Sequence, residues 1–113
     1  MFNSLFAFND RFERKSLDEP LVDSATLLLA QRFLAALPSE LAAPELAVDP
    51  DGEISFDWFG RSGRNFSVSL RSDGRVAYAG AFGPEKTKYG TDRFDDQVPE
   101  EIVEAVRDLQ ETA

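Results

Sequence analysis

Three runs of alternating apolar and polar residues, separated by short turns, fill the segment from Glu53 to Ala81. An alternation with a period of two gives each run one apolar face, which is typical of a half-buried β-strand. The turns contain glycine, serine and aspartate, which accept the backbone angles of a tight reversal. Because connections this short join antiparallel neighbours, the segment predicts three successive antiparallel strands. Their expected inward side chains are Ile54, Phe56, Trp58, Phe66, Val68, Leu70, Val76 and Tyr78.

The residues on either side of this segment decide the width of the sheet. Leu46 and Val48 alternate with polar or small neighbours just before it and predict a short additional strand. Residues 83–97 are rich in glycine, lysine and aspartate, and we interpret them as a loop with room for a short edge strand near residues 86–89. The sheet expected from the sequence is therefore a four-stranded antiparallel meander.

Two helical patterns flank the strands and can cover an apolar sheet face. The first helix is predicted over residues 20–37, because Pro20 suits a first helical turn and Pro38 ends the run. Its expected sheet-facing residues are Val22, Ala25, Leu29, Phe33, Ala36 and Leu37. The second helix is predicted over residues 99–110, with an apolar stripe opposite an acidic one. The fold class expected is α+β: a four-stranded antiparallel meander packed against an N-terminal helix, with a C-terminal helix alongside.

The absence of cysteine and histidine from all 113 residues excludes several kinds of site. Disulfides and thiolate metal sites are impossible, and the commonest general base and metal ligand is missing. The serines have no histidine or cysteine to activate them. The acids Asp49, Asp51 and Glu53 surround a Pro-Asp-Gly turn and need no metal to explain them. The sequence therefore predicts no enzyme, no metal site and no cofactor.

The length and the hydropathy of the chain predict a single soluble domain. A chain of 113 residues with 42% hydrophobic residues is large enough for one core. No apolar run is long enough to span a bilayer, and the N-terminus lacks the basic start and apolar core of a signal peptide. We therefore expect a cytoplasmic protein with no membrane partner.

The charge is distributed unevenly along the chain. The formal net charge is −9, yet residues 61–91 contain six basic residues and only two acidic ones. Basic residues beside aromatic ones on a sheet are one way to bind single-stranded nucleic acid, so the basic strands over 61–88 form an alternative, nucleic-acid-contacting surface. The competing interpretation is a solvated face whose arginines pair with acids such as Asp57, and the overall negative charge favours it.

We expect the first 15 residues to form an aromatic N-terminal arm in front of a single α+β domain over residues 16–113. Phe2, Phe6 and Phe8 lie here among charged and amide residues. Aromatic surface of this extent is seldom left in water. Two interpretations stay open: the arm folds back over its own domain, or it binds another protein.

Two further surfaces are candidates for a partner. Leu27 and Leu34 are one heptad apart and are expected to point away from the sheet-facing stripe of the first helix. Phe59, Arg71 and Arg75 have the parity of the outer sheet face. The expected partner-binding residues are therefore Phe2, Phe6, Phe8, Leu27, Leu34, Phe59, Arg71 and Arg75.

The block that starts at Pro44 resembles small uncharacterised bacterial proteins with a helix-plus-β-meander fold. The residues behind this resemblance are an Asp-Gly turn before an aromatic strand, a Phe-Ser-Val-Ser run, a second Asp-Gly turn and a helix at Pro99: Asp51, Gly52, Ile54, Phe56, Trp58, Phe66, Ser67, Val68, Ser69, Asp73, Gly74 and Tyr78. The resemblance implies a fold and brings no activity and no site residues.

The function expected is non-catalytic protein binding, by a small regulatory, immunity-like or inhibitor protein. One version of this hypothesis uses the acidity itself. Acidic side chains on and before the last helix would imitate nucleic-acid phosphates for a nucleic-acid-binding enzyme, as phage and mobile-element inhibitors of host defence do; they are Asp92, Asp95, Asp96, Glu100, Glu101, Glu104 and Asp108. The competing interpretation is an ordinary solvated helix face, which is the more frequent meaning of such a charge run. The expected partner is another protein, or a second copy of the chain in a homodimer.

Overall fold

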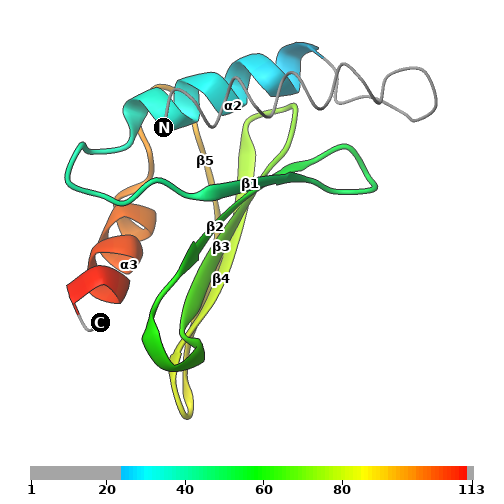
Figure 1. The fold of residues 1–113 in the computed structure, drawn as a ribbon. Helices are drawn as coiled ribbons and strands as arrows, with labels where there is room; N and C mark the ends of the chain where they lie inside the picture. Colours follow the sequence, from blue (N-terminus) through cyan, green and yellow to red (C-terminus); the bar gives the residue numbers. More distant parts are fainter. Residues whose placement is uncertain (1–23, 112–113) are drawn as a thin grey trace.

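The structure is a computed structural model and describes residues 24–111 (Figure 1). Its elements are α2 (Ser24–Ala36), β1 (Glu45–Val48), β2 (Ile54–Phe59), the 3-10 turn η1 (Arg61–Gly63), β3 (Asn65–Leu70), β4 (Arg75–Gly83), β5 (Lys86–Arg93) and α3 (Glu100–Glu111). The predicted arm at residues 1–15, with Phe2, Phe6 and Phe8, lies outside the described residues. The same holds for the first residues of the helix predicted over 20–37.

The five strands form one antiparallel sheet in the order β1-β2-β3-β4-β5. This confirms the α+β class, the meander and the four predicted strands. The register aligns apolar residues across the sheet, as in the row formed by Phe56, Val68 and Tyr78. A short loop thus joins each strand to its neighbour, as the turn residues predicted.

The prediction of a four-stranded sheet is wrong by one strand. Residues 86–93, expected to lie mostly in a loop, form β5 and pair with β4 along their whole length. The sequence concealed this strand because its inward positions hold Lys88, Gly90 and Asp92. An edge strand with polar and small inward residues shows no apolar alternation, although its backbone completes the ladder.

Both helices pack against the same face of the sheet, as Figure 1 shows. α2 contacts β2 and β3, and α3 contacts β3. The centre of the core is aromatic: the ring centroids of Phe33 and Phe56 lie 4.6 Å apart, and those of Phe33 and Phe94 lie 5.4 Å apart. All eight predicted inward side chains belong to this core or pack against it. Tyr78 is the one of the eight that is only partly buried.

The buried face of α2 is rotated from the predicted one. Ala30 and Leu34 are buried in the core, whereas Ala25 is exposed and Leu29 is only partly buried. The expectation that Leu34 points away from the core is therefore wrong. Apolar residues surround nearly the whole helix, so a helical wheel could not select one face. Packing against the sheet made the selection.

Two inward glycines make room for the large rings of this core. The Cβ atom of a residue other than glycine at position 90 would lie 2.6 Å from the hydroxyl oxygen of Tyr78. At position 80 it would lie 2.6 Å from the carbonyl oxygen of Asn65 and 2.8 Å from the ring of Phe66. The rings therefore occupy the space above the glycines, an arrangement that also stabilises glycine in a strand.

We predict that Gly80→Ala lowers the free energy of unfolding by about 1–3 kcal/mol, since the added methyl group overpacks a filled site. Ala79→Ser is the matched control, because this neighbouring side chain is exposed and points to the other face. Urea denaturation measures both. Equal stability of the two variants would contradict this prediction, because it would show that the core accommodates the added methyl group without strain.

Candidate functional site

The candidate site is the outer face of the sheet, defined as the face opposite α2 and α3. No element among residues 24–111 covers it. Its positions alternate with the core positions along each strand, and its middle consists of small side chains: Ala47, Ser55, Ser67, Ser69, Ala77, Ala79, Ala81 and Thr91. The outer face is therefore a flat, weakly polar surface with little bulk at its centre.

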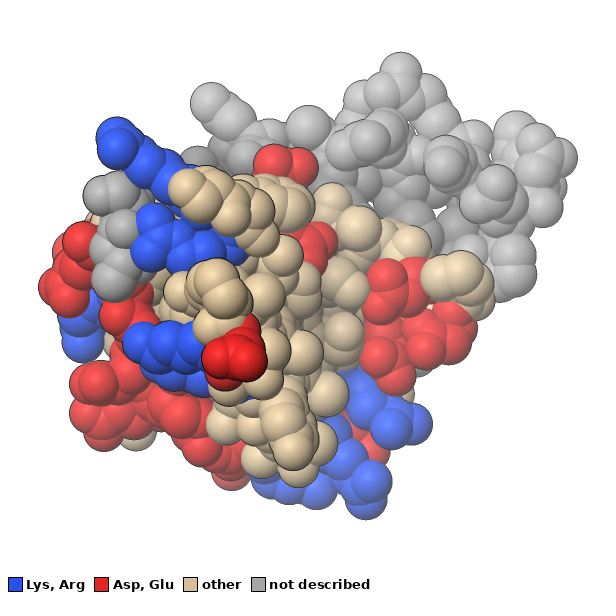
Figure 2. Space-filling view, turned by 90° about the horizontal axis from the view of Figure 1, so that it is seen from below, with Lys and Arg blue, Asp and Glu red and all other residues tan. Residues whose placement is uncertain are grey.

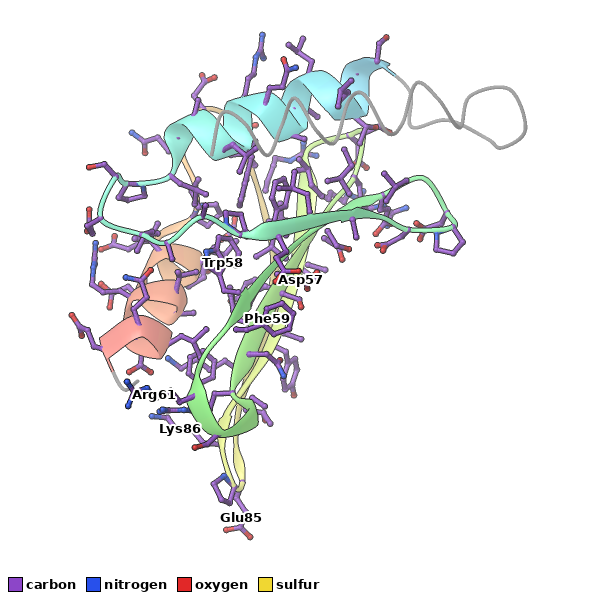
Figure 3. The ribbon with its side chains drawn as sticks, viewed as in Figure 1. Asp57, Trp58, Phe59, Arg61, Glu85 and Lys86 are labelled. Atoms are coloured by element: carbon purple, nitrogen blue, oxygen red, sulfur yellow. The ribbon has the colours of Figure 1, made fainter. Side chains whose placement is uncertain are left out.

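Two aromatic side chains rise from this surface. Phe59 is 67% exposed and Tyr89 is 80% exposed, the two most exposed large hydrophobic residues among those described. Figure 3 shows Trp58 on the helix side of β2, with Asp57 and Phe59 on the other side. Phe59 was predicted as a binding residue. Tyr89 was not predicted as a binding residue, because residues 83–97 were interpreted as a loop with at most a short edge strand near 86–89, although the alternating residues Thr87, Tyr89 and Thr91 were a visible signal.

Charged residues divide the outer face into two halves. The half formed by β1 and β2 has Glu45, Asp49, Glu53 and Asp57. The half formed by β3, β4 and β5 has three arginines: Arg71, Arg75 and Arg93. Two of these arginines were predicted as binding residues, whereas Arg93 and Glu45 were not. The structure thus joins arginines from three strands at one end of the face.

The arginines do not pair with Asp57, which was one expectation. Arg71 Nε lies 3.4 Å from Glu53 Oε2, and Arg75 Nε lies 3.4 Å from Asp73 Oδ2. Asp57 instead accepts a hydrogen bond from the Ser67 hydroxyl. A hydrogen bond from the backbone N–H of Arg75, together with nearby guanidinium groups, lowers the pKa of Asp73. The arginine of each ion pair is exposed, so both pairs add little to stability.

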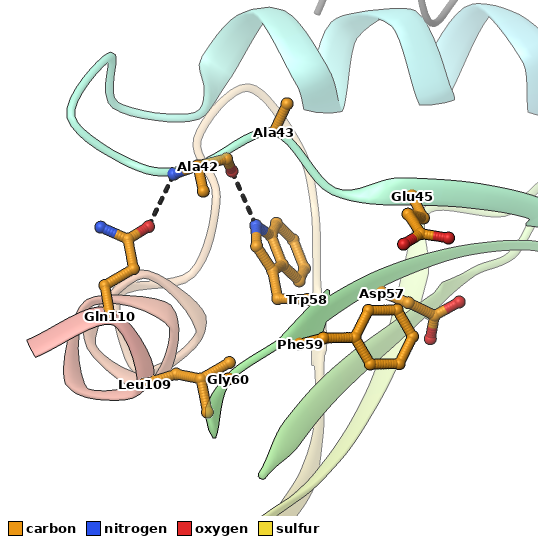
Figure 4. Close-up of a pocket in the computed structure, with 9 residues that line it drawn as sticks. All are labelled: Ala42, Ala43, Glu45, Asp57, Trp58, Phe59, Gly60, Leu109 and Gln110. Atoms are coloured by element: carbon orange, nitrogen blue, oxygen red, sulfur yellow. Dashed lines mark hydrogen bonds between the residues drawn. The ribbon is translucent and has the colours of Figure 1, made fainter. Parts of the chain in front are cut away.

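A hollow borders each half of the outer face. The one beside the acidic half has a volume of about 370 Å³ and lies between that half and the end of α3; its lining residues are Glu45, Asp57 and Phe59, together with Ala42, Ala43, Trp58, Gly60, Leu109 and Gln110. In Figure 4 the two carboxylates and the Phe59 ring lie on one side of this hollow. The hollow of about 510 Å³ in the arginine half is lined by Arg71, Arg75, Val76, Ala77, Thr91, Asp92 and Arg93.

The connector between α2 and β1, residues 37–44, fixes the wall of the hollow beside the acidic half through hydrogen bonds. The indole N–H of Trp58 donates to the carbonyl of Ala42 at 2.8 Å, and the N–H of Ala42 donates to Gln110 Oε1 at 2.6 Å (Figure 4). Arg107 of α3 contacts Glu40 at 2.6 Å. These contacts join the connector, β2 and the end of α3 behind Phe59, so they hold the exposed ring on a rigid support.

The basic residues beyond the outer face are largely engaged by acids. Lys86 and Lys88 both approach Asp108 of α3, at 3.9 and 3.2 Å. Lys88 also lies over the ring of Phe82, 4.7 Å from its centroid, on the helix side of the sheet. Figure 2 shows Lys and Arg in separate groups with acidic side chains beside them. The basic strands therefore do not form one continuous positive band in this view.

The acidic turn after β1 brings carboxylate oxygens of Asp49, Asp51 and Glu53 within 4.8 Å of one another. Each acid has another role. Asp49 accepts from the hydroxyl of Ser55, Asp51 accepts from the backbone N–H of Glu53, and Glu53 pairs with Arg71. These contacts support the interpretation of this segment as a structural turn.

The leucine surface predicted on the first helix is not available as expected. Leu34 is 3% exposed, and Leu27 is partly buried against the core. The exposed leucine of α2 is Leu28, at 48%. Among the described residues, therefore, the strongest aromatic exposure is on the sheet.

Comparison with protein-family models, with curated proteins and with solved structures found no match. The resemblance to small bacterial helix-plus-meander proteins stays a prediction. Within residues 24–111, neither helix is long and apolar enough to cross a bilayer.

We predict that Trp58→Phe lowers the free energy of unfolding by about 1–2 kcal/mol, because the hydrogen bond to Ala42 is lost and the smaller ring leaves a gap. Phe59→Leu, one residue further along β2, is the control and should change stability by less than about 0.5 kcal/mol. Thermal and urea denaturation test this. A larger effect at Phe59 would show that the outer ring belongs to the core.

The Glu40–Arg107 contact predicts a pH effect. The hydrogen bond from Arg107 lowers the pKa of Glu40 below its ordinary value of 4.5. A carboxylate with a lowered native pKa stabilises the fold above its ordinary pKa, and this contribution disappears as the pH falls through the native value. Glu40→Gln should therefore have a slightly lower melting temperature than the natural protein at about pH 6, and the difference should shrink as the pH falls below 4.5. A difference independent of pH would contradict this role.

Proposed function

We propose that the protein is a non-catalytic protein-binding module that docks a partner on the outer face of its sheet. The observation that supports this most is the pair of aromatic side chains, Phe59 and Tyr89, exposed at 67% and 80% on a face that no described element covers. The role is regulatory, immunity-like or inhibitory, which includes the inhibition of a defence enzyme, and the protein acts by occupying a surface of its partner.

The physical form of the outer face fits protein binding. Aromatic residues are enriched in protein interfaces, where a few of them contribute most of the binding energy. Phe59 and Tyr89 extend from paired strands, so little side-chain or backbone freedom is lost on binding. The small residues between them, such as Ser67 and Ala79, let a second surface approach closely.

Nucleic-acid binding through the basic strands has weaker support. Arg71, Arg75, Lys86 and Lys88 each approach a carboxylate within 4.0 Å. A chain with a net charge of −9 also repels a polyanion over long distances. Both effects therefore favour a protein partner over a nucleic acid.

The test is an affinity capture from source-cell lysate with three baits: the natural protein, the double variant Phe59→Ser/Tyr89→Ser, and Leu28→Ser. The last is the matched control, because Leu28 is an exposed hydrophobic residue on α2, away from the sheet. We expect a stoichiometric protein with the natural and control baits, at least about tenfold less with the double variant, and no effect of nuclease.

Two results would overturn the proposed function. Equal capture by all three baits would move binding away from the outer face. Capture that disappears with nuclease, and that weakens steeply with salt, would replace the protein partner by nucleic acid.

A further inference from the structure

We infer that the partner for the outer face is a second copy of this chain, joined through a two-fold axis that runs parallel to the strands. The inference rests on the proposed function and names its partner. It comes from a row of charged residues that crosses all five strands at one end of the sheet.

The register defines this row. Asp49 pairs with Glu53 through a backbone hydrogen bond, and Glu53 lies beside Arg71 in the register of β2 and β3. The backbone N–H of Arg71 donates a hydrogen bond to the carbonyl of Arg75. Arg75 is directly opposite Arg93 in the register of β4 and β5. Read across the sheet, the row is negative at its first two positions and positive at its last three.

A row with this order of charges is complementary to its own reverse. A two-fold axis parallel to the strands, between two facing sheets, keeps each row and reverses the order of the strands. β2 then faces β4 of the second copy, and β1 faces β5. Glu53 consequently faces Arg75 of the second copy, and Asp49 faces Arg93 of the second copy. Both contacts occur twice in the dimer.

The alternative axis, perpendicular to the strands, places each strand over its own copy. The acidic halves then face each other, Glu45 and Asp57 of both copies included, and so do the arginine halves. Like charges in contact oppose association. The charge pattern therefore selects the parallel axis, which also gives the aligned packing that two twisted sheets prefer.

Side-chain size agrees with the same axis. Phe59 lies in one row with Ala81, so the reversed strand order brings each Phe59 over Ala81 of the second copy. Each of these large side chains thereby meets a small one, at the end of the interface away from the charged row. Arg71 of the two copies lie near the axis, and the Glu53 that pairs with each of them reduces their repulsion.

The area is sufficient for a specific dimer. Five strands spaced by about 4.8 Å and about 20 Å long present a face of about 500 Å², so a dimer buries about 1,000 Å² in total. This is close to the smallest size of specific interfaces, and we expect a reversible dimer.

The experiment is sedimentation equilibrium of the full chain with two charge-reversal variants, Arg75→Glu and Glu53→Lys. Each creates two like-charge contacts and should raise the dissociation constant of the dimer by about a hundredfold. An equimolar mixture should form a one-to-one heterodimer with nearly natural affinity, because the new glutamate faces the new lysine. Arg32→Glu is the control: it makes the same charge change on an exposed part of α2 and should leave the dimer intact.

Ala79→Arg gives a test independent of charge. Ala79 is exposed at the centre of the outer face, so the large side chain should leave folding unchanged, as circular dichroism will show, and should give a monomer. A monomeric natural protein at all concentrations would overturn the inference, as would failure of the mixture to associate. The proposed function would survive that outcome if the outer-face double variant still lost a captured protein, so the two failures can be told apart.

Discussion

One-sided burial of the sheet is the constraint on which the structure depends. β2, β3 and β4 direct most of their large apolar residues to the same face, where both helices meet them around Phe33 and Phe56. Burial of such side chains is the main source of folding free energy in a domain of this size. Loss of either helix would expose the inward strand residues, and the sheet would lose the burial free energy that stabilises it.

The same constraint explains the inward glycines. A face that must bury rings from β3 and β4 needs space above the neighbouring strand, and Gly80 and Gly90 provide it. β5 itself contributes almost no apolar surface to the core. Its attachment relies on the ladder with β4, on the Tyr78 ring above Gly90 and on the contact of Lys88 with Asp108.

Separation of the two faces lets stability and binding vary independently. Residues of the helix side determine whether the chain folds, whereas outer-face residues such as Phe59, Tyr89 and Arg75 are exposed and contribute little to the core. A surface of this kind can acquire a partner without a loss of stability. Its charge order, with acids on β1 and β2 and arginines on β3 to β5, arises only when the strands are paired.

The amino-acid sequence by itself determined the strands with apolar alternation, their antiparallel order, the second helix and the inward set from Ile54 to Val76, because these depend on local period and turn chemistry. It also identified Phe59, Arg71 and Arg75 as outward residues by parity. Tertiary structure alone decided that β5 is a full strand over Lys86–Arg93, since that strand is held by pairing and not by its own hydrophobicity. It also decided which side of α2 is buried, because a helix that is apolar nearly all round can be oriented only by the surface it meets. The tertiary structure also decided the charged row across the five strands, since residues far apart in the chain become neighbours only through the register of the sheet.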